Sequence, residues 1–226
     1  MSRIRSLVVA TSALVALSAT PALAKSAFDG AYVGLQGGYN FVTPDADHQT
    51  VIGGDAIATS STDKNADGFT GGIYAGFGQT FDRFYVGAEV DAGYSDAKGT
   101  ATPNSARYSF EAKESYGVSG RVGYLFSDTA LVYGRVGWQR TDIDFTGNPG
   151  VPTIGGTPAV ASFGGELDGV RYGIGSEVVV GQNLLLRAEY SYTDYEDFTV
   201  TYPLGAGNSR VDAHENLVRA GIAYRF

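Results

Sequence analysis

The chain ends on the stretch 216–226, "NLVRAGIAYRF", and its alternation decides the fold. Every second residue back from the end is apolar, whereas the residues between carry arginine and glycine. The two sets are Val218, Ala220, Ile222, Tyr224 and Phe226 against Leu217, Arg219, Gly221, Ala223 and Arg225. A period of two is typical of a β-strand whose two faces meet different surroundings. The rest of the sequence must decide which face lies inside.

The same alternation recurs in seven earlier segments. They are 31–41, 68–81, 84–95, 115–126, 130–139, 169–180 and 184–195. Each is close to the ~9–11 residues of a tilted transmembrane β-strand. No segment after the N-terminal region has the 3.6-residue period of an amphipathic helix. The sequence therefore predicts an all-β fold, an eight-stranded antiparallel transmembrane β-barrel.

The connections between these segments alternate in length. Short turns are predicted at 81–83, 127–128 and 181–183, and long polar or Gly/Pro-rich loops at 43–67, 96–107, 142–168 and 196–214. Short periplasmic turns and longer extracellular loops are typical of an outer-membrane barrel. An even strand number also returns both termini to the periplasmic side. Aromatic residues lie near both ends of the strands, where interfacial girdles are expected.

The N-terminus has the layout of a secretory signal peptide. Arg3 and Arg5 precede an apolar run, and a small-x-small site ends at Ala24, so cleavage is predicted between Ala24 and Lys25. The apolar run is shorter than the ~20 residues that a membrane-spanning helix needs. We expect residues 1–24 to be removed and 25–226 to form a single outer-membrane β-barrel domain.

Composition narrows the possible functions. The chain has 32 Gly, 15 Tyr, 12 Phe and no Cys, so no disulfide stabilises this exported protein. The predicted mature part, without two of the 16 basic residues, has 14 basic and 24 acidic side chains and a formal charge of −10. An acidic exported chain is a poor candidate for binding nucleic acid. No cofactor is indicated by any motif.

The charged residues within the strands share one face. They lie with Gly, Ser and Thr, opposite faces of Val, Ile, Leu, Phe, Tyr and Ala, and they are Glu89, Asp91, Arg121, Arg135, Arg171, Glu177, Arg187, Glu189, Arg219 and Arg225. A soluble lipocalin-type barrel would have an apolar lumen and a charged exterior, and a membrane barrel inverts this. The signal peptide and the loop lengths favour lipid outside. A soluble secreted barrel or sandwich that binds a ligand remains the alternative.

The residues "GVRYGIGSEVVVGQNLLLRAEYSYTDYEDF" at 169–198, with "HENLVRAGIAYRF" at 214–226, resemble the last three strands of a known family. It is that of the OmpA-like "porin family" surface proteins of Gram-negative bacteria, especially of alphaproteobacteria. The early segments "DGAYVGLQGGYNF" and "FTGGIYAGFGQTF" are similar to its first hairpin. The resemblance covers most of the mature chain and implies a location in the cell outer membrane. It also implies that Phe226, with Tyr224, is the assembly signal for the barrel-assembly machinery.

The strand number limits what the barrel can do. An eight-stranded barrel is just wide enough for side chains to fill, whereas water-filled porins have about 16–18 strands. Six arginines and four acidic residues are predicted to pair across the lumen, because an unpaired buried charge costs several kcal/mol. For Arg219 and Arg225 we expect Glu89, Glu177 and Glu189 as partners. We interpret the set as a stabilising network of ion pairs. A narrow, low-conductance pathway for small solutes is the alternative.

Two weaker motifs remain. His48 and His214, the two histidines of the chain, lie in or beside predicted outer loops with no nucleophile at a telling spacing, so no catalysis is expected. Asp63, Asn65 and Asp67 followed by Gly68 match the start of an EF-hand loop, but the twelfth position is Tyr74 instead of Glu. An acidic loop that ends in a glycine turn is the simpler interpretation, and weak divalent-ion binding there is a hypothesis. No metal site is predicted.

The sequence therefore predicts a structural, surface-exposed barrel that contributes to outer-membrane integrity. Its partners would be outer-membrane lipid, the assembly machinery during insertion and, through the acidic loops, host or cell-surface ligands.

Overall fold

The computed structural model describes residues 26–52, 55–61, 66–101, 107–148, 161–196, 198–201 and 208–226. The strands in these ranges are β1 (Gly30–Ile52), β2 (Asp55–Ser61), β3 (Ala66–Phe81), β4 (Phe84–Ser95), β5 (Lys98–Ala101), β6 (Arg107–Ser127), β7 (Ala130–Asn148), β8 (Ala161–Val180), β9 (Leu184–Tyr195), β10 (Phe198–Thr201) and β11 (Asn208–Arg225). Among the residues described, no helix is long and apolar enough to cross a membrane.

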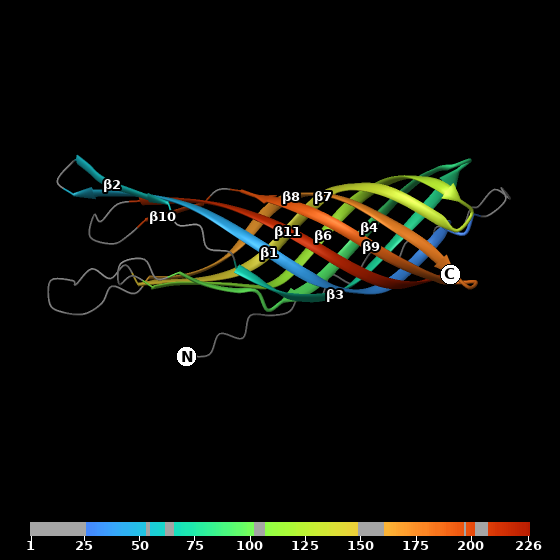
Figure 1. The fold of residues 1–226 in the computed structure, drawn as a ribbon, viewed down its shortest axis with the longest axis horizontal. Helices are drawn as coiled ribbons and strands as arrows, with labels where there is room; N and C mark the ends of the chain where they lie inside the picture. Colours follow the sequence, from blue (N-terminus) through green and yellow to red (C-terminus); the bar gives the residue numbers. More distant parts are fainter. Residues whose placement is uncertain are drawn as a thin grey trace, which may run out of the picture.

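Eight of these strands close into an antiparallel barrel. The order around it is β1, β3, β4, β6, β7, β8, β9 and β11, and β11 pairs back with β1 from Tyr32↔Arg225 to Gln49↔Asn208. Figure 1 shows the tilted strands crossing one another around a common axis, with the C-terminus at the end that carries the short turns. The predicted eight-stranded antiparallel barrel is confirmed.

The connections at the two ends of the barrel differ in length. The short turns lie where the sequence predicts them, whereas parts of the predicted long loops are strands. Two residues separate β3 from β4 and β6 from β7, and three separate β8 from β9. Asp82 and Gly181 have φ of 58° and 73° in these turns, a left-handed conformation that Gly and Asp adopt readily.

The prediction of a loop from Thr43 to Asp67 is wrong in part. Strand β1 continues to Ile52, pairs there with β11 and turns back through β2. Likewise β7 extends to Asn148, β8 starts at Ala161 and β11 starts at Asn208, within segments predicted as loops. Backbone pairing continues because the neighbouring strands extend together. A hydrogen-bonded ladder needs no apolar alternation, so the sequence pattern did not reveal it.

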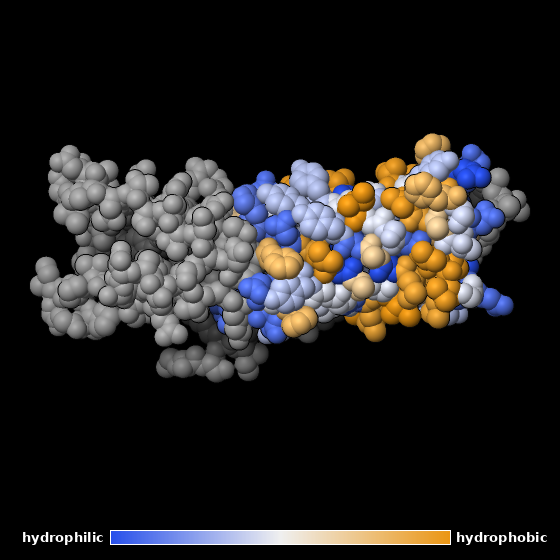
Figure 2. All heavy atoms as spheres, viewed as in Figure 1, coloured by the Kyte–Doolittle hydropathy of each residue, from blue (hydrophilic) through white to orange (hydrophobic). Residues whose placement is uncertain are grey.

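The outer surface carries the apolar residues of the alternation. Leu35, Ile73, Val122, Ile174 and Val218 are each exposed by 44% or more. An apolar surface this extensive is what a bilayer requires. In Figure 2, apolar residues gather over the half of the barrel nearer the short turns. Aromatic side chains flank it: Phe81, Phe84, Tyr124, Phe126, Tyr224 and Phe226 at the short-turn end, and Phe69, Tyr94, Tyr116, Trp138 and Tyr190 toward the other.

The interior nearest the short turns is filled by a group that we call the tyrosine layer. It consists of Phe28, Tyr32, Tyr74, Tyr85, Leu125, Leu131, Tyr133, Leu185 and Ala223. Glycines of neighbouring strands make room for the tyrosine rings. A Cβ atom on Gly76 would lie 2.3 Å from the Tyr32 hydroxyl, and one on Gly175 would lie 2.4 Å from the Tyr133 hydroxyl. In each pair a tyrosine ring fills the space beside a glycine, which has no side chain. This accounts for part of the Gly- and Tyr-rich composition.

Candidate functional site in the barrel lumen

Nine of the ten charged residues predicted to face the lumen meet in one group, which we call the charged layer. Its members are Glu89 and Asp91 on β4, Arg121 on β6, Arg135 on β7, Arg171 and Glu177 on β8, Arg187 and Glu189 on β9, and Arg219 on β11. All are 7% exposed or less. Strand alternation turns them inward, and the strand pairing brings them to similar heights.

Glu89 is the centre of the charged layer. Its carboxylate accepts hydrogen bonds from Arg187 at 2.6 and 2.9 Å and from Arg121 Nη1 at 3.3 Å. It also accepts from Arg135 Nη1 at 3.4 Å. Arg187 and Arg121 both continue to Glu177, with 2.7 Å between each Nη2 and Glu177 Oε1. The guanidinium group suits this role because its planar fork can bridge two carboxylates at once.

A second part of the layer is organised around Asp91 and Glu189. Arg135 donates to Asp91 Oδ1 at 2.9 Å and to Glu189 Oε1 at 3.0 Å. Arg171 donates to Asp91 Oδ2 at 2.9 Å, and Arg219 Nε donates to Glu189 Oε1 at 3.0 Å. The whole layer has five arginines and four carboxylates, so it carries one excess positive charge. That excess lies on the side that faces away from the short turns, where three arginines share Asp91.

The tyrosine layer closes the charged layer on the short-turn side. The Tyr32 hydroxyl donates to Glu89 at 2.8 Å and accepts from Arg121 at 2.8 Å. The Tyr133 hydroxyl donates to Glu189 at 2.6 Å. Arg121 stacks over the Tyr133 ring at 3.7 Å, a cation–π contact that is strong when both groups are desolvated.

Sequence reasoning did not identify the tyrosine layer as part of the site. The available signal was the position of Tyr32, Tyr74, Tyr85 and Tyr133 on the glycine-bearing face near the short turns. Phe28 gave no signal, because it precedes the first strand.

On the other side of the charged layer lies a set that we call the upper polar layer. Its members are Asn40, Ser95, Gln139, Thr141, Tyr195 and Glu215. The Glu215 carboxylate accepts from the Tyr195 hydroxyl at 2.6 Å, from Gln139 at 3.1 Å and from Asn40 at 3.3 Å. Glu215 was not singled out from the sequence, because it falls outside the alternating segment 216–226.

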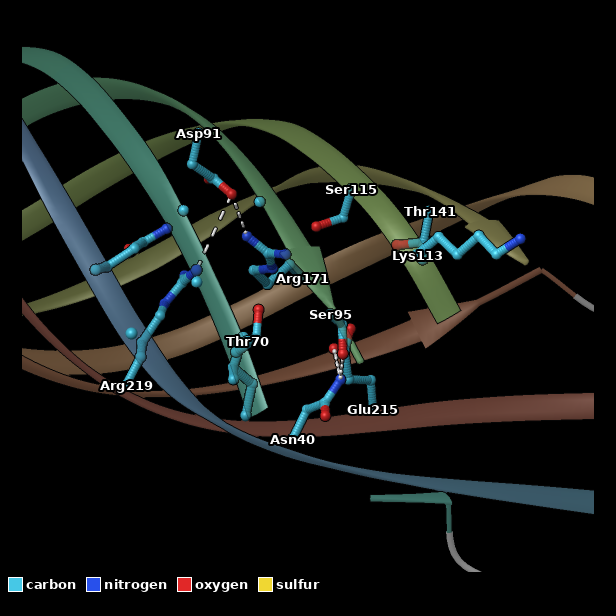
Figure 3. Close-up of a pocket in the computed structure, with 16 residues that line it drawn as sticks. Asn40, Thr70, Asp91, Ser95, Lys113, Ser115, Thr141, Arg171, Glu215 and Arg219 are labelled. Carbon is cyan, nitrogen blue, oxygen red and sulfur yellow. Dashed lines mark hydrogen bonds and ion pairs between the residues drawn. The ribbon is translucent and has the colours of Figure 1, made fainter. Parts of the chain in front are cut away.

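A cavity separates the charged layer from the upper polar layer. Asp91, Arg171 and Arg219 line it on one side, and Asn40, Ser95 and Glu215 line it on the other (Figure 3). The volume open to the centre of a water molecule is about 20 Å³. On both sides of this small polar space, the acidic side chains of the described lumen therefore accept hydrogen bonds from arginine or from neutral donors.

The prediction that Arg225 pairs with a lumen carboxylate is wrong. Its guanidinium group instead donates to the backbone carbonyls of Ser26 at 3.1 Å, Asp29 at 3.4 Å and Gln182 at 3.2 Å. The physical reason is its position at the very end of β11, where the chain turn at Ser26–Asp29 reaches the rim. Arg219, in contrast, pairs with Glu189, one of its three expected partners.

The turn at Ser26–Asp29, which we call the N-terminal turn, fixes this rim. The Asp29 carboxylate accepts from the backbone N–H groups of Ser26 at 2.8 Å and Thr80 at 2.6 Å. Phe28, 2% exposed, is inserted into the tyrosine layer. The first and last described segments of the chain thus close the short-turn end together.

The other predicted site residues lie outside the charged layer or outside the described residues. Tyr224 and Phe226 lie on the outer surface at the short-turn rim, 48% and 65% exposed, and their role as an assembly signal stays a prediction. Ala24 and Lys25, Asp63 and Asn65, and the side chain of His48 lie outside the described residues. Asp67 accepts a hydrogen bond from the Tyr39 hydroxyl, and His214 faces Asp194 at 3.1 Å. Within the ranges described, no group of three or more His, Cys, Asp or Glu side chains could hold a metal ion.

Comparison with known proteins agrees with this architecture. The model of the outer membrane protein beta-barrel domain matches residues 10–226. The chain is 27% identical over 206 residues to a 22 kDa outer membrane protein of Rhizobium leguminosarum bv. viciae, covering 91% of this chain and 82% of that one. It is 28% identical over 212 residues to a 31 kDa outer-membrane immunogenic protein of Brucella melitensis, covering 87% and 83%.

Two solved structures share the fold. The outer membrane protein OprG from Pseudomonas aeruginosa has a TM-score of 0.56 at 14% identity, covering 88% of this chain and 97% of that one. The outer membrane protease OmpT from Escherichia coli has a TM-score of 0.51 at 7% identity, covering 91% and 99%. Together with the lipid-facing surface, the matches locate the protein in the outer membrane. The alternative of a soluble secreted barrel is therefore wrong.

Proposed function

The chain belongs to the family of outer membrane protein beta-barrel domains, and on that premise we propose that it is a closed structural barrel with no catalytic activity. The observation that carries this proposal is the charged layer. Nine buried charges from six strands tie opposite walls of the lumen together, and the tyrosine layer lies directly beneath them. A cross-linked lumen of this kind favours mechanical integrity of the outer membrane over transport.

The contacts of the lumen carboxylates also favour a barrel without catalytic activity. A catalytic carboxylate needs a free oxygen near a substrate and an accessible cleft. Glu89, Asp91, Glu177 and Glu189 are each 7% exposed or less and each accepts from at least one arginine. The fold shared with the protease OmpT supplies no catalytic residue by itself, because fold and function are separable.

The second part of the proposal concerns the end of the barrel away from the short turns. There the described outer residues include Glu114, Asp142, Glu166, Asp194 and Glu196, so the exterior of this end is acidic. Relatives named immunogenic proteins are consistent with surface exposure of this end. We propose that it contacts host or cell-surface ligands, and that the barrel-assembly machinery inserts the chain through Tyr224 and Phe226.

The low-conductance channel is the competing function, and planar-bilayer recording separates the two. We expect no reproducible unit conductance from the purified, refolded barrel in 1 M KCl. At this salt concentration the Debye screening length is about 3 Å. The variant Glu89→Gln, which removes the central carboxylate of the charged layer, is recorded under the same conditions, and its conductance is compared with that of the wild-type protein. A regular conductance step from the wild-type protein would establish the channel and reject the closed barrel.

A further inference from the structure

The strand pairing of the barrel wall is interrupted at the end away from the short turns. Residues 161–168 of β8 pair along their whole length with β7, but the pairing of β8 with β9 ends at Gly169↔Tyr195. Strand β10 continues the chain beyond β9, and among the residues described it pairs with β11 alone. Within the described part of the chain, one edge of residues 161–168 therefore has no strand beside it. We call this segment the β8 edge.

A comparable break beyond the end of β4 is filled by the chain itself. Strand β4 ends at Ser95, and β5 continues the wall because it pairs with both β3 and β6. In that register Lys98 lies opposite Asp67 on β3 and opposite Glu111 on β6, so a cationic residue stands between two acidic positions. Beside the β8 edge no described strand has this role. Figure 1 shows β10 on the same side of this end as β2, apart from the yellow and orange ends of β7 and β8.

A hollow lies at the foot of the β8 edge, where β8 and β10 diverge. Its lining includes two aromatic residues and three carboxylates, namely Trp138, Tyr195, Asp168, Asp194 and Glu196. About 480 Å³ of it is open to the centre of a water molecule, against about 20 Å³ for the cavity in the lumen. The hollow therefore has room for the side chains of a ligand.

The side chains of the β8 edge alternate between the two faces of the wall. Glu166 and Asp168 lie on the outer face. Leu167 lies on the inner face, 7% exposed, in an apolar cluster with residues of β7, β9 and β11. Side chains of neighbouring strands contact one another on each face of a sheet. A strand beside the β8 edge should therefore be apolar on its inner face and complementary to carboxylates on its outer face.

The outer face is negative at this place. Asp168 accepts two hydrogen bonds of 2.7 Å from Arg140, and Glu166 accepts one of 3.0 Å from the same guanidinium group. The side chain of Asp194 is 57% exposed. Glu196 is also exposed, and no described residue pairs with its carboxylate. These four carboxylates share a single guanidinium group, so the local charge favours a cationic partner.

We propose that the β8 edge binds an extended cationic peptide segment of a partner protein, which adds a strand to β8 and continues the barrel wall. Main-chain hydrogen bonds to β8 supply affinity, as in other cases of strand addition. Apolar side chains of the segment pack on Leu167 and Tyr195, and the lysine or arginine side chains between them reach Asp168 and Glu196. This inference rests on the proposed contact of this end with surface ligands and names their chemical class.

Two synthetic peptides test strand addition on the wild-type barrel in zwitterionic lipid vesicles. Both are capped peptides of alternating lysine and valine, as long as the β8 edge, and in one of them the backbone nitrogens are methylated. The methylated peptide keeps the charge and the side chains but donates no main-chain hydrogen bond. Trp138 lines the hollow and is the single tryptophan of the chain, so its emission reports binding. We expect a saturable emission shift with the unmethylated peptide, and binding of the methylated peptide that is at least about tenfold weaker.

A charge variant tests the position of the site. Glu196→Gln removes one exposed carboxylate at the foot of the β8 edge and should weaken binding of the unmethylated peptide by about two- to fivefold. Glu114→Gln is the matched control, because Glu114 is exposed on the outside of β6 and does not line the hollow. It should leave the affinity unchanged. Equal affinities of the two variants would overturn the assignment of the site.

The peptide pair separates this inference from the proposed function. Equal binding of the two peptides would mean that the acidic end attracts cations without strand addition, which overturns the inference and leaves the surface contact intact. No response of Trp138 to either peptide would also overturn it, and would mean that a segment of this chain fills the place or that nothing does. A conductance step in planar bilayers bears on the closed barrel alone.

Discussion

Replacement of Glu89 by glutamine should destabilise the barrel more than any other isosteric change in the lumen. Glu89 is 1% exposed and accepts from Arg187, Arg121, Arg135 and Tyr32. The variant Glu89→Gln keeps the size of the side chain but leaves five arginines against three carboxylates, so the excess positive charge rises from one to two. Removing one partner of a buried ion pair typically costs 3–5 kcal/mol. Because one carbonyl oxygen remains to accept, we expect a loss near the lower limit, about 3 kcal/mol.

Urea unfolding in lipid vesicles measures this loss. Trp138 is the single tryptophan of the chain and lies 38% exposed on the outer surface, so its fluorescence reports departure from the membrane. Glu114→Gln is the matched control, because Glu114 is exposed on the outside of β6, and it should change stability by no more than about 0.5 kcal/mol. In a double-mutant cycle with Arg187→Met, the two losses should be non-additive by more than about 1 kcal/mol. A loss below about 1 kcal/mol for Glu89→Gln would refute the central role of this carboxylate.

Three further changes test other parts of the structure. Ala220→Arg, on the lipid-facing side of β11, should cost about 2–4 kcal/mol in the same assay, and a neutral result would mean that the faces are reversed. Arg225→Ala removes three hydrogen bonds to the rim and should cost about 1.5–3 kcal/mol, whereas Arg83→Ala at a short turn should be nearly neutral in urea unfolding. Gly175→Ala forces a Cβ atom against Tyr133 and should lower stability by about 1–3 kcal/mol. Gly134→Ala has free space and should leave the heat-dependent gel shift of the folded barrel unchanged, and equal effects at the two glycines would contradict the packing.

The face of each strand could be predicted because the period of two is a local property. Arg135 and Glu189 are inward for the same reason that Val136 and Tyr190 are outward, and no knowledge of neighbouring strands is needed. The choice of partners could not be predicted in the same way. Glu89 and Arg187 are 98 residues apart, and they meet only because of the relative stagger of strands across the barrel.

The errors also have physical causes. Arg225 follows the inward pattern of β11, yet its height places it at the rim beside the N-terminal turn, below the carboxylates. Phe28 belongs to no strand, so alternation could not place it in the tyrosine layer. The extension of β1 to Ile52 depends on pairing with β2 and β11, and such backbone pairing leaves little trace in a polar sequence.

The fit between tyrosine and glycine in the lumen has a consequence for how such sequences diverge. The ring of Tyr133 occupies the space that a side chain at position 175 would need, and Tyr32 does the same to position 76. A substitution at either member of such a pair changes which residues the other can accept. Positions 133 and 175, and positions 32 and 76, should therefore vary together among descendants of this barrel, so that volume lost on one strand is regained on another.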